Sequence, residues 1–438
     1  MKVIVLGAGV VGVSTAYYLA KQGHQVVVIE KSSNSASGCS FANGGQLSYS
    51  HIETWSNKSF VKAMLKGVIL NSSFVKINDY SNLNFYKWIY NFLKNSTAEN
   101  SLKNSKKLHK LTTLSQKLMN KILLDEIVFK NGEVFDYQQK GSLHFYRLKK
   151  NLNSAISRLD ELKNLHLNYQ ILTPDECVTI EPSLHELQNN NKLAGGIFFK
   201  NDASGDCYKF TANLEEICKE KYGVEFIFDC EIKNILTNFK KITGINTSNG
   251  VMVADKYVYA MGAISTKLLS GIGIDTNIYP IRGYSLTLNN NKLLFSNLAI
   301  TDNENKMVYS RLGKSIRVAG LAEMNGANSE NSSRNINFLY NVILKTFALD
   351  IDKAKIKEWH GIRPFRPNSI PLIGQIEQLS NFYLNTGHGS LGWTNCLASG
   401  KIIAHKISVE SNSYLTENEF EQFNFLNDEF KNIFKNPR

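Results

Sequence analysis

Three glycines near the N-terminus have the spacing of a phosphate-binding turn. Gly7, Gly9 and Gly12 directly follow a short apolar run at residues 3–6. Glycines in this pattern make a tight turn, allow the backbone to approach a pyrophosphate, and let the next helix pack closely on the strand. The N–H groups that open such a helix face the phosphates. We therefore expect a dinucleotide to be held by Gly7, Ala8, Gly9, Val10, Val11 and Gly12.

An acidic residue ends the second apolar run of the chain. Residues 26–29 are all apolar, as in a buried parallel strand, and Glu30 follows them, eighteen residues after Gly12. A carboxylate in this position accepts hydrogen bonds from ribose hydroxyls and disfavours a 2′-phosphate. The glycines, both apolar runs and the acid have the spacing along the chain that one dinucleotide-binding unit requires. This agreement predicts a strand–helix–strand dinucleotide-binding unit with Glu30 and Lys31 at its ribose end.

Two arginines near the C-terminus are suited to holding a carboxylate. Arg363 and Arg366 each precede a proline, and a proline keeps the residue before it out of the helical region. We expect both arginines on a stiff, extended loop. A guanidinium held in this way offers two parallel hydrogen bonds to a carboxylate.

A glycine-rich stretch follows at residues 385–396. Its glycines interrupt the start of a helix that we expect to run to Ile407. The N-terminus of that helix carries unpaired N–H groups and partial positive charge, which stabilise negative charge developing on a reduced cofactor. His388 in this stretch invites assignment as a base, but a loop residue placed by its backbone is the favoured interpretation.

The elements that must position these residues change character along the chain. Small residues at 35–47 predict a loop that runs close against a ligand. Residues 58–123 have the period of amphipathic helices, and strand patterns alternate with short helices from residue 133 onward. The predicted fold class is α/β, with α+β character overall. It combines a Rossmann-like dinucleotide-binding domain with a discontinuous substrate domain built on an antiparallel sheet.

Domain boundaries follow from this reading. We expect the dinucleotide-binding domain to comprise residues 1–50, 203–276 and 357–410. The substrate domain, or cap, would comprise residues 51–202 and 277–356, including the basic helical segment 58–123. Residues 411–438 would form a C-terminal tail.

Length and composition bound the class of protein. A chain of 438 residues with 43% hydrophobic residues suits a globular protein of two domains. Met1 leads directly into the first strand, and no apolar run approaches the ~18 residues of a membrane-spanning helix. Six cysteines lie apart, without a Cys-x-x-Cys pair, and so indicate reduced thiols rather than disulfides or a metal site. These features predict a cytoplasmic protein with no bound metal.

The positive charge is concentrated in one segment. Of the net charge of +12, residues 58–121 carry +10, from twelve lysines against Asp79 and Glu99. Aromatic residues crowd the same segment, most densely at 85–92. Apolar helix faces at this spacing are more often core than anchor, but lysines beside large apolar residues also suit an anionic membrane surface. Because the segment has no arginine, we favour a membrane over a nucleic acid and expect no nucleic-acid partner.

These motifs together resemble bacterial D-amino-acid dehydrogenases, within the larger group of FAD-dependent D-amino-acid and glycine oxidases. The resemblance spans about residues 2–407, with three departures: Arg282 for a more usual lysine, Asn368 for aspartate and Met261 for a smaller residue. Besides the N-terminal motif, it rests on residues 40–46 (SFANGGQ), 205–206 (GD), 279–285 (YPIRGYS), 361–364 (GIRP) and 385–394 (NTGHGSLGWT).

The resemblance implies a non-covalent FAD. Related sarcosine oxidases attach their flavin through a cysteine aligned near Gly361, and glycine removes that route here. In relatives an arginine matching Arg363 pairs with the substrate carboxylate, and tyrosines matching Tyr309 and, less closely, Tyr284 line the substrate pocket. The implied cofactor residues outside the first motif are Ser40, Gly44, Gly45, Gln46 and Leu47, then Ile232 beside the adenine, Gly262, and Gly387, His388, Gly389, Leu391, Gly392, Trp393 and Thr394 beside the isoalloxazine.

The function so implied is oxidative deamination of D-amino acids such as D-alanine to 2-oxo acids and ammonia. Hydride passes to the flavin without a side-chain base, and electrons continue to a quinone or another respiratory acceptor. Docking on the inner face of the cell membrane would bring the flavin near such an acceptor. An oxygen-using oxidase of the glycine or sarcosine oxidase type and a flavoprotein acting on modified tRNA remain alternatives. A nicotinamide dehydrogenase is disfavoured, because the chain has no second glycine motif for that cofactor.

Overall fold

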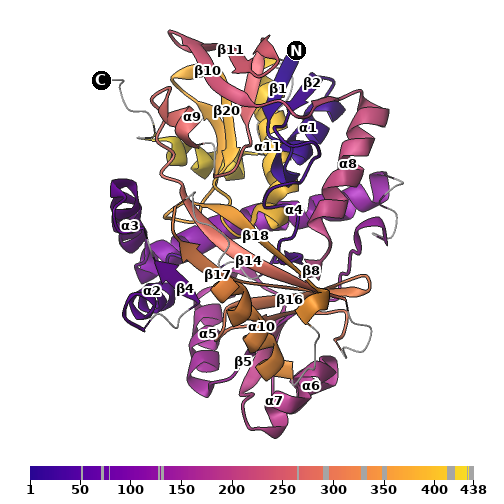
Figure 1. Cartoon of the computed structure of the whole chain (residues 1–438), viewed down its shortest axis with the longest axis vertical. Helices are drawn as coiled ribbons and strands as arrows, with labels where there is room; N and C mark the ends of the chain where they lie inside the picture. Colours follow the sequence, from indigo (N-terminus) through magenta and orange to yellow (C-terminus); the bar gives the residue numbers. More distant parts are fainter. Residues whose placement is uncertain are drawn as a thin grey trace.

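The computed structural model describes residues 1–50, 53–70, 74–77, 79–126, 129, 133–263, 266–289, 295–326, 333–347, 353–411, 420–431 and 433. These residues form an upper lobe around a six-stranded sheet and a lower lobe around a nine-stranded sheet (Figure 1). Both the Rossmann-like unit and a mainly antiparallel cap sheet are present, although β5 (Ser142–Tyr146) pairs with β15 (Ala299–Asp302) and β4 (Val75–Ile77) with β17 (Ser315–Met324) in parallel. The predicted fold class is confirmed.

The upper lobe is built on the predicted strand–helix–strand unit. Its central strands are fully buried because helices cover one face and a β-meander covers the other, which explains why their sequences are apolar throughout. All neighbours pair in parallel except the edge strand β19. In spatial order the sheet contains β19 (Leu372–Ile376), β20 (Leu379–Thr386), β13 (Lys256–Tyr259), β1 (Lys2–Leu6), β2 (Gln25–Ile29) and β9 (Glu225–Ile227).

The two faces of this sheet are covered differently. Helix α1 (Val10–Lys21) packs with three others in one apolar core. The opposite face meets isoleucines of the meander and the short helix α9 (Thr266–Ser270). The other helices of the first face are α4 (Ala98–Asp125), α8 (Cys207–Tyr222) and α11 (Gly392–Ser411), and the meander strands are β10 (Ile232–Asn238), β11 (Lys241–Thr247) and β12 (Gly250–Met252).

The cap sheet is organised around its longest strand. Strand β14 (Tyr279–Asn289) pairs antiparallel with β18 (Ile356–Phe365) on one side and with β17 (Ser315–Met324) on the other. Helix α10 (Ser333–Phe347) packs on the lower face of the sheet (Figure 1). The sheet continues with β16 (Met307–Leu312), β15 (Ala299–Asp302), β5 (Ser142–Tyr146), β7 (Gly195–Phe199) and β6 (Tyr169–Leu172), while β4 (Val75–Ile77) pairs with β17.

The remaining helices lie around the cap. Helix α3 (Leu83–Asn95) lies at the left edge of the molecule beside α2 (Lys58–Leu70) (Figure 1). None of the described helices is long and apolar enough to cross a membrane. The other short elements are α5 (Lys149–Glu161), α6 (Pro174–Ile180), α7 (His185–Asn189), the pair β3 (Gln46–Leu47) and β8 (Ala203–Ser204), and 3-10 turns at Lys163–Leu165, Pro182–Leu184, Lys353–Lys355 and Glu421–Phe430.

Three parts of the predicted domain division differ from the structure. Residues 357–365 belong to the cap sheet, because β14 pairs with β18 along its whole length. Arg363 therefore lies in a strand and not on a loop. Helix α4, expected in the cap, packs its leucines into the core of the upper lobe. Residues 421–430, expected in the tail, form a 3-10 helix with Phe423, Leu426 and Phe430 buried.

Candidate active site

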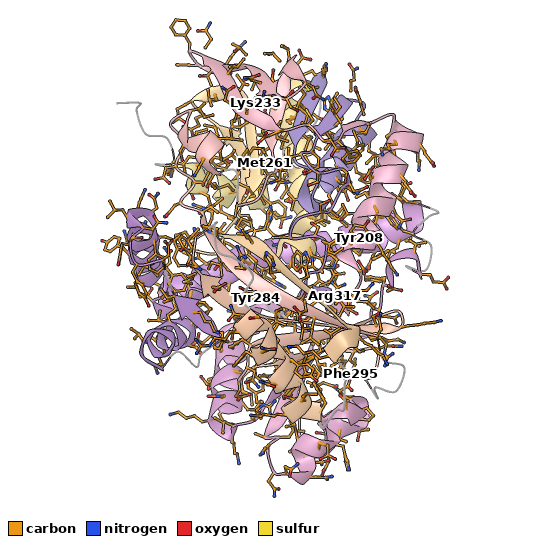
Figure 2. The ribbon with its side chains drawn as sticks, viewed as in Figure 1. Tyr208, Lys233, Met261, Tyr284, Phe295 and Arg317 are labelled. Atoms are coloured by element: carbon orange, nitrogen blue, oxygen red, sulfur yellow. The ribbon has the colours of Figure 1, made fainter. Side chains whose placement is uncertain are left out.

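A cavity of about 830 Å³ lies between the two lobes. Its upper wall is formed by loops at the carboxyl ends of β1, β2, β13 and β20, where ligands bind in open α/β sheets. Its lower wall is the face of the cap sheet that points away from α10. Figure 2 shows Met261 in the upper lobe and both Tyr284 and Arg317 on the cap sheet below it.

The N-terminal glycine turn forms one end of the upper wall. Gly7 has φ of +99°, and a Cβ on Gly12 would lie 1.9 Å from the Gly7 carbonyl oxygen. Side chains are therefore excluded from both positions. The Glu30 carboxylate accepts hydrogen bonds from the backbone N–H groups of Ala8 at 2.9 Å and Ser32 at 3.0 Å. These bonds hold the carboxylate at the cavity, where it can accept further hydrogen bonds from ribose hydroxyls.

The small-residue loop is suspended between the two lobes. Ser40 Oγ accepts a hydrogen bond from the Val10 N–H at 3.0 Å and so covers the glycine turn. Three carbonyls of the loop accept hydrogen bonds from the cap sheet: Ala42 from Ser285 at 2.6 Å, Asn43 from Arg317 at 3.1 Å and Gly44 from Ser310 at 2.8 Å. Because the cap sheet holds these carbonyls, the loop has one fixed course along the cavity.

The glycine-rich C-terminal stretch opens α11 at the cavity. His388 Nε2 lies 2.9 Å from Asn385 Oδ1, and Asn385 Nδ2 donates to Thr15 Oγ1 at 3.0 Å. Since the amide group donates to Thr15, its oxygen accepts from His388, and the Nε2 proton is held there. Burial lowers the pKa of His388 to about 3. The imidazole is therefore neutral and contributes no charge at this helix N-terminus.

The two C-terminal motifs are joined directly. Phe365 at the end of β18 forms a β-bridge with His388, and the Gly389 N–H donates to the Pro364 carbonyl at 2.9 Å. The strand that carries Arg363 is thereby tied to the loop that opens α11. A carboxylate held by Arg363 would have a defined position relative to that helix N-terminus.

The guanidinium of Arg363 lies at the cavity between backbone and an indole ring. Its Nη1 donates to the Leu321 carbonyl at 2.8 Å, and its Cζ lies 5.9 Å from the centroid of the Trp55 ring. A Cβ on Gly283 would lie 2.2 Å from Nη2, so glycine on β14 makes room for the guanidinium. Among the described residues, no carboxylate forms an ion pair with Arg363. This cation is therefore available to an anionic ligand.

A bulge in β17 supplies the carbonyl that Arg363 contacts. Tyr284 pairs with Gly320 but Arg282 pairs with Glu323, so β17 has one extra residue there. Leu321 in the bulge has φ of +64°, an uncommon conformation for a side chain of its size. The conformation keeps the Leu321 side chain in the core with α10 while its carbonyl faces Arg363. Strain of this kind clusters at ligand sites.

Arg366 has a different environment three residues later. Its Nη1 donates to Glu429 at 2.8 Å and to the Ile370 carbonyl at 2.9 Å, and the ion pair is buried. Asn368 donates to the same Glu429 carboxylate at 2.6 Å, which an aspartate in its place could not do. Arg366 is thus neutralised within the fold.

The two predicted tyrosines face the other side of the cap sheet. Tyr309 is fully buried in the core against α10 and does not line the cavity; its neighbour Val308 does. Tyr284 lies along the cavity wall, but its ring belongs to the same core and its hydroxyl donates to Glu323. Successive side chains of a strand point to opposite faces of the sheet, and both tyrosine side chains point to the face that packs on α10. Tyr309 is thus absent from the cavity lining, and a substrate role for Tyr284 stays a prediction.

Most of the predicted cofactor residues border the cavity. Four do not: Ala8, Gly12, Leu47 and Gly387 shape the turns behind it. Sequence reasoning missed Gly283, although a glycine inside a strand pattern is a signal of close approach. It also missed Trp55 and Leu321, whose positions depend on tertiary packing. The predicted residues that line the cavity are Gly7, Gly9, Val10, Val11, Glu30, Lys31, Ser40, Gly44, Gly45, Gln46, Ile232, Gly262, Tyr284, Arg363, His388, Gly389, Leu391, Gly392, Trp393 and Thr394.

Comparison with known proteins gives consistent findings across the whole chain. Residues 2–406 match the family model described as FAD dependent oxidoreductase. The chain is 38% identical to a D-amino acid dehydrogenase from Paramagnetospirillum magneticum, over 93% of this chain and 95% of the relative. It is 35% identical to a D-amino acid dehydrogenase from Neisseria meningitidis serogroup C, over 93% and 96% respectively.

Solved structures show the same fold at lower identity. A glycine oxidase from Bacillus cereus superposes with a TM-score of 0.71 at 20% identity, covering 100% of this chain and 99% of that one. An L-proline dehydrogenase from P. horikoshii superposes with a TM-score of 0.71 at 18% identity, covering 98% and 99%.

The residues of this chain fit an FAD. The glycine turn leaves space for a pyrophosphate, Glu30 is held as an acceptor for the ribose, and the start of α11 lies at the cavity. Met261 borders the cavity. Its Cα would lie 3.2 Å from a Cβ on Gly7, so the two backbones approach closely there. FAD would therefore extend from Glu30 towards the loop around His388.

Proposed function

This chain belongs to the family of FAD-dependent oxidoreductases, and we propose that it oxidises D-amino acids to 2-oxo acids and ammonia, passing electrons to an acceptor other than oxygen. The relatives with 32–38% identity that bear the name D-amino acid dehydrogenase support this substrate class. The proposed acceptor is a quinone or another respiratory component.

Arg363 is the observation that carries the proposal. Its guanidinium lies at the cavity with no carboxylate partner among the described residues, whereas Arg366 nearby is neutralised by Glu429. A charge-assisted pair with a substrate carboxylate is stronger than a neutral hydrogen bond and fixes orientation. An amino acid held there would present its α-carbon to the loop that opens α11.

The protein contributes position and electrostatics to the reaction. FAD, when bound, supplies the chemistry by accepting the hydride from the α-carbon. Arg363 holds the carboxylate, and Leu321 and Gly283 hold Arg363. The N-terminus of α11 stabilises negative charge that develops nearby. The substrate amine enters deprotonated, and the imine product is hydrolysed by water to the 2-oxo acid and ammonia.

His388 is not assigned a base role. Its Nε2 proton is held by Asn385, and its pKa of about 3 makes the imidazole a weak base at neutral pH. The backbone of this loop is the part that borders the cofactor in the proposal.

An anaerobic absorption spectrum tests the proposed activity. D-Alanine or D-phenylalanine should bleach the yellow holoenzyme, and the L-enantiomers should not. A quinone analogue should then restore the oxidised spectrum much faster than air. Rapid recovery in air would favour the oxygen-using alternative, and a spectrum unchanged by any D-amino acid would overturn the proposal.

The FAD is proposed to be non-covalent. Position 361 is a glycine and not a cysteine, and a Cβ there would have to displace the Trp359 ring, which lies 2.1 Å away. Cys39 borders the cavity, but burial raises the pKa of its thiol to about 11, and the thiol donates to the Ile362 carbonyl at 2.6 Å. A protonated thiol is a poor nucleophile. Acid precipitation should release the yellow colour into the supernatant; colour kept in the pellet would contradict this.

A second proposal is that α3 docks the enzyme on an anionic membrane. The helix buries Phe85, Trp88 and Phe92, as a core helix would. It also has a second apolar face that is exposed: Leu83 is 84% exposed, Tyr86 50%, Tyr90 69% and Leu93 48%. Lysines flank this face and that of α2, where Leu65 is 60% exposed. Aliphatic and aromatic residues edged by lysine suit a lipid headgroup surface.

Vesicle co-sedimentation tests this docking. Holoenzyme should bind anionic vesicles at low salt, and binding should fall with salt and with Lys62→Gln, Lys94→Gln and Tyr90→Ser. Phe239→Ser is the matched control, because Phe239 is 96% exposed on the meander, away from α3. The side chain of Lys66, a further lysine of α2, lies outside the described residues. Equal recovery in the supernatant with and without anionic lipid would overturn the docking.

A further inference from the structure

We propose that the substrate side chain lies against an aromatic wall made by Trp55, Phe60 and Phe74, so that the site prefers D-amino acids with large apolar side chains. The inference rests on the proposed oxidation of D-amino acids at Arg363. It adds a preference: aromatic and large aliphatic D-amino acids above D-alanine, and D-alanine above acidic D-amino acids.

The wall begins at the carboxylate site. The Trp55 ring lies 5.9 Å from Arg363 Cζ, the Phe60 ring lies 4.8 Å from Trp55, and the Phe74 ring lies 6.2 Å from Phe60. All three residues border the cavity. The rings therefore form a continuous path that starts at Arg363 and leads away from it.

Buried aromatic residues support the wall from behind. Trp55 packs on Phe365 with ring centroids 4.2 Å apart, and Phe60 packs on Phe92 at 5.6 Å. Phe365 and Phe92 are each about 2% exposed or less. Because the supporting side chains are fully packed, Trp55 and Phe60 cannot retreat to admit solvent behind them.

Small residues of β17 border the cavity near the wall, although a side chain at Gly320 would point to the core under α10. Ala322 donates its N–H to the Phe74 carbonyl at 2.8 Å, and Ala319 and Gly320 precede the Leu321 bulge along the same strand. Short side chains on the sheet beside large rings leave space for a side chain of the substrate. The same bulge fixes Arg363, so carboxylate site and wall share one rigid strand.

The three rings carry no charge, and few charged side chains border the cavity. Apart from Arg363, those on described residues that border it are Glu30, Lys31, Glu231 and Lys267 at the dinucleotide end, and the exposed Glu53 and Lys306. The wall itself offers an ionic side chain no partner, so a D-glutamate or D-aspartate side chain would lose hydration without compensation. An apolar side chain gains by burial, at about 10-fold or more per well-packed group.

Steady-state kinetics with a quinone analogue tests the preference in the holoenzyme. The kcat/KM for D-phenylalanine and D-leucine should exceed that for D-alanine by about 10-fold, and that for D-glutamate should be lowest. Oxidation of D-alanine with equal or faster rates than D-phenylalanine would overturn the wall and leave the proposed function intact. Oxidation of no D-amino acid would instead overturn the proposed function.

A binding measurement separates the wall from turnover. Phenylacetate should perturb the flavin spectrum at a concentration about 10-fold lower than acetate, because both offer a carboxylate to Arg363 and only one reaches the rings. This titration needs no oxidation and so tests the wall even if the D-amino acid proposal fails. Equal affinities would overturn the wall.

A pair of variants locates the preference. Phe74→Ala should lower the ratio of kcat/KM for D-phenylalanine over D-alanine by about 5-fold or more. Phe338→Ala is the control, because Phe338 is also half-buried but lies on α10, packs on the core there and does not border the cavity. It should leave the ratio unchanged. A shift of the ratio by both variants, or by neither, would overturn the assignment.

Discussion

The two walls of the cavity differ in the groups that they present to a ligand. The upper wall is mostly backbone: glycine turns at Gly7–Gly12 and Gly387–Gly392, each opening a helix. The lower wall is mostly side chains on one face of a sheet, and Arg363 lies on the edge strand β18 of that sheet. A backbone wall recognises a ligand through N–H groups and close approach, and a side-chain wall through charge and shape.

This difference decides what each wall tolerates. At the N-terminal turn of the upper wall an added methyl group meets backbone that cannot move, as between Gly12 and the Gly7 carbonyl. In the lower wall an added methyl group meets the end of a flexible side chain, as between Gly283 and Arg363. Substitutions of the same size should therefore abolish binding on one side and only displace a group on the other.

The largest effect is expected for Gly12→Ala. Its Cβ would lie 1.9 Å from the Gly7 carbonyl oxygen, so α1 must separate from β1 and the phosphate turn must open. The purified variant should contain almost no flavin, measured as the ratio of flavin to protein absorbance. Gly271→Ala adds a methyl with ordinary contacts of 3.4 Å or more and should keep full flavin content. Normal flavin content in Gly12→Ala would break the contrast between the walls.

The next effect separates the two arginines. Arg363→Ala should lower kcat/KM by at least ~100-fold while the flavin spectrum stays intact, because a bidentate charged pair in a desolvated site is lost. Arg366→Ala leaves the buried Glu429 with Lys107, at 3.2 Å, as its remaining cation, and should lower folding stability. Its surviving holoenzyme should keep kcat/KM within a few fold. If Arg366→Ala is the variant that loses activity at normal stability, the assignment of Arg363 is wrong.

The backbone wall was largely predictable from sequence, because its signals are local. A glycine turn, its helix and the acid after the next strand are close in the chain, and spacing alone identifies them. The glycine-rich start of α11 is equally local. The Rossmann-like unit follows from such short patterns, whereas the rest of the upper wall was predicted from the family resemblance.

The side-chain wall was less predictable, because alternate residues of a strand face opposite sides of the sheet. Tyr309 and Tyr284 were expected at the substrate, and a shift of one residue along a strand changes the face. The bulge at Leu321 also changes the phase of β17, and no residue type in its sequence announces it. Arg363 borders the cavity in a strand and not on a loop, and its role as the carboxylate anchor stays a prediction. Helix α3 shows the same limit, since both its buried and exposed faces are apolar.

A smaller effect is expected from Gly283→Ala. Its backbone lies in the ordinary extended region, so alanine is allowed there, but the methyl would lie 2.2 Å from Arg363 Nη2. The guanidinium must shift and lose its alignment with a carboxylate, so kcat/KM should fall by about 10-fold, mainly through a higher KM. Flavin content and thermal stability should stay near those of the unaltered enzyme. An unchanged KM would show that the carboxylate does not depend on this position of Arg363.

The smallest effect concerns charge in the backbone wall. If N–H groups alone supply its field, His388 must stay neutral when folded, as its pKa of about 3 indicates. Between that value and the ordinary 6.5, the unfolded chain binds a proton that the folded chain does not, so stability falls as pH decreases through this window. From pH 6.5 to 5.5 this one group should account for about 1 kcal/mol of lost unfolding free energy. His388→Gln should remove that part of the loss in denaturant titrations of the holoenzyme, with Asn385 still buried beside it. An equal loss in both proteins would mean that His388 is protonated in the folded state, and the upper wall would then carry a charge of its own.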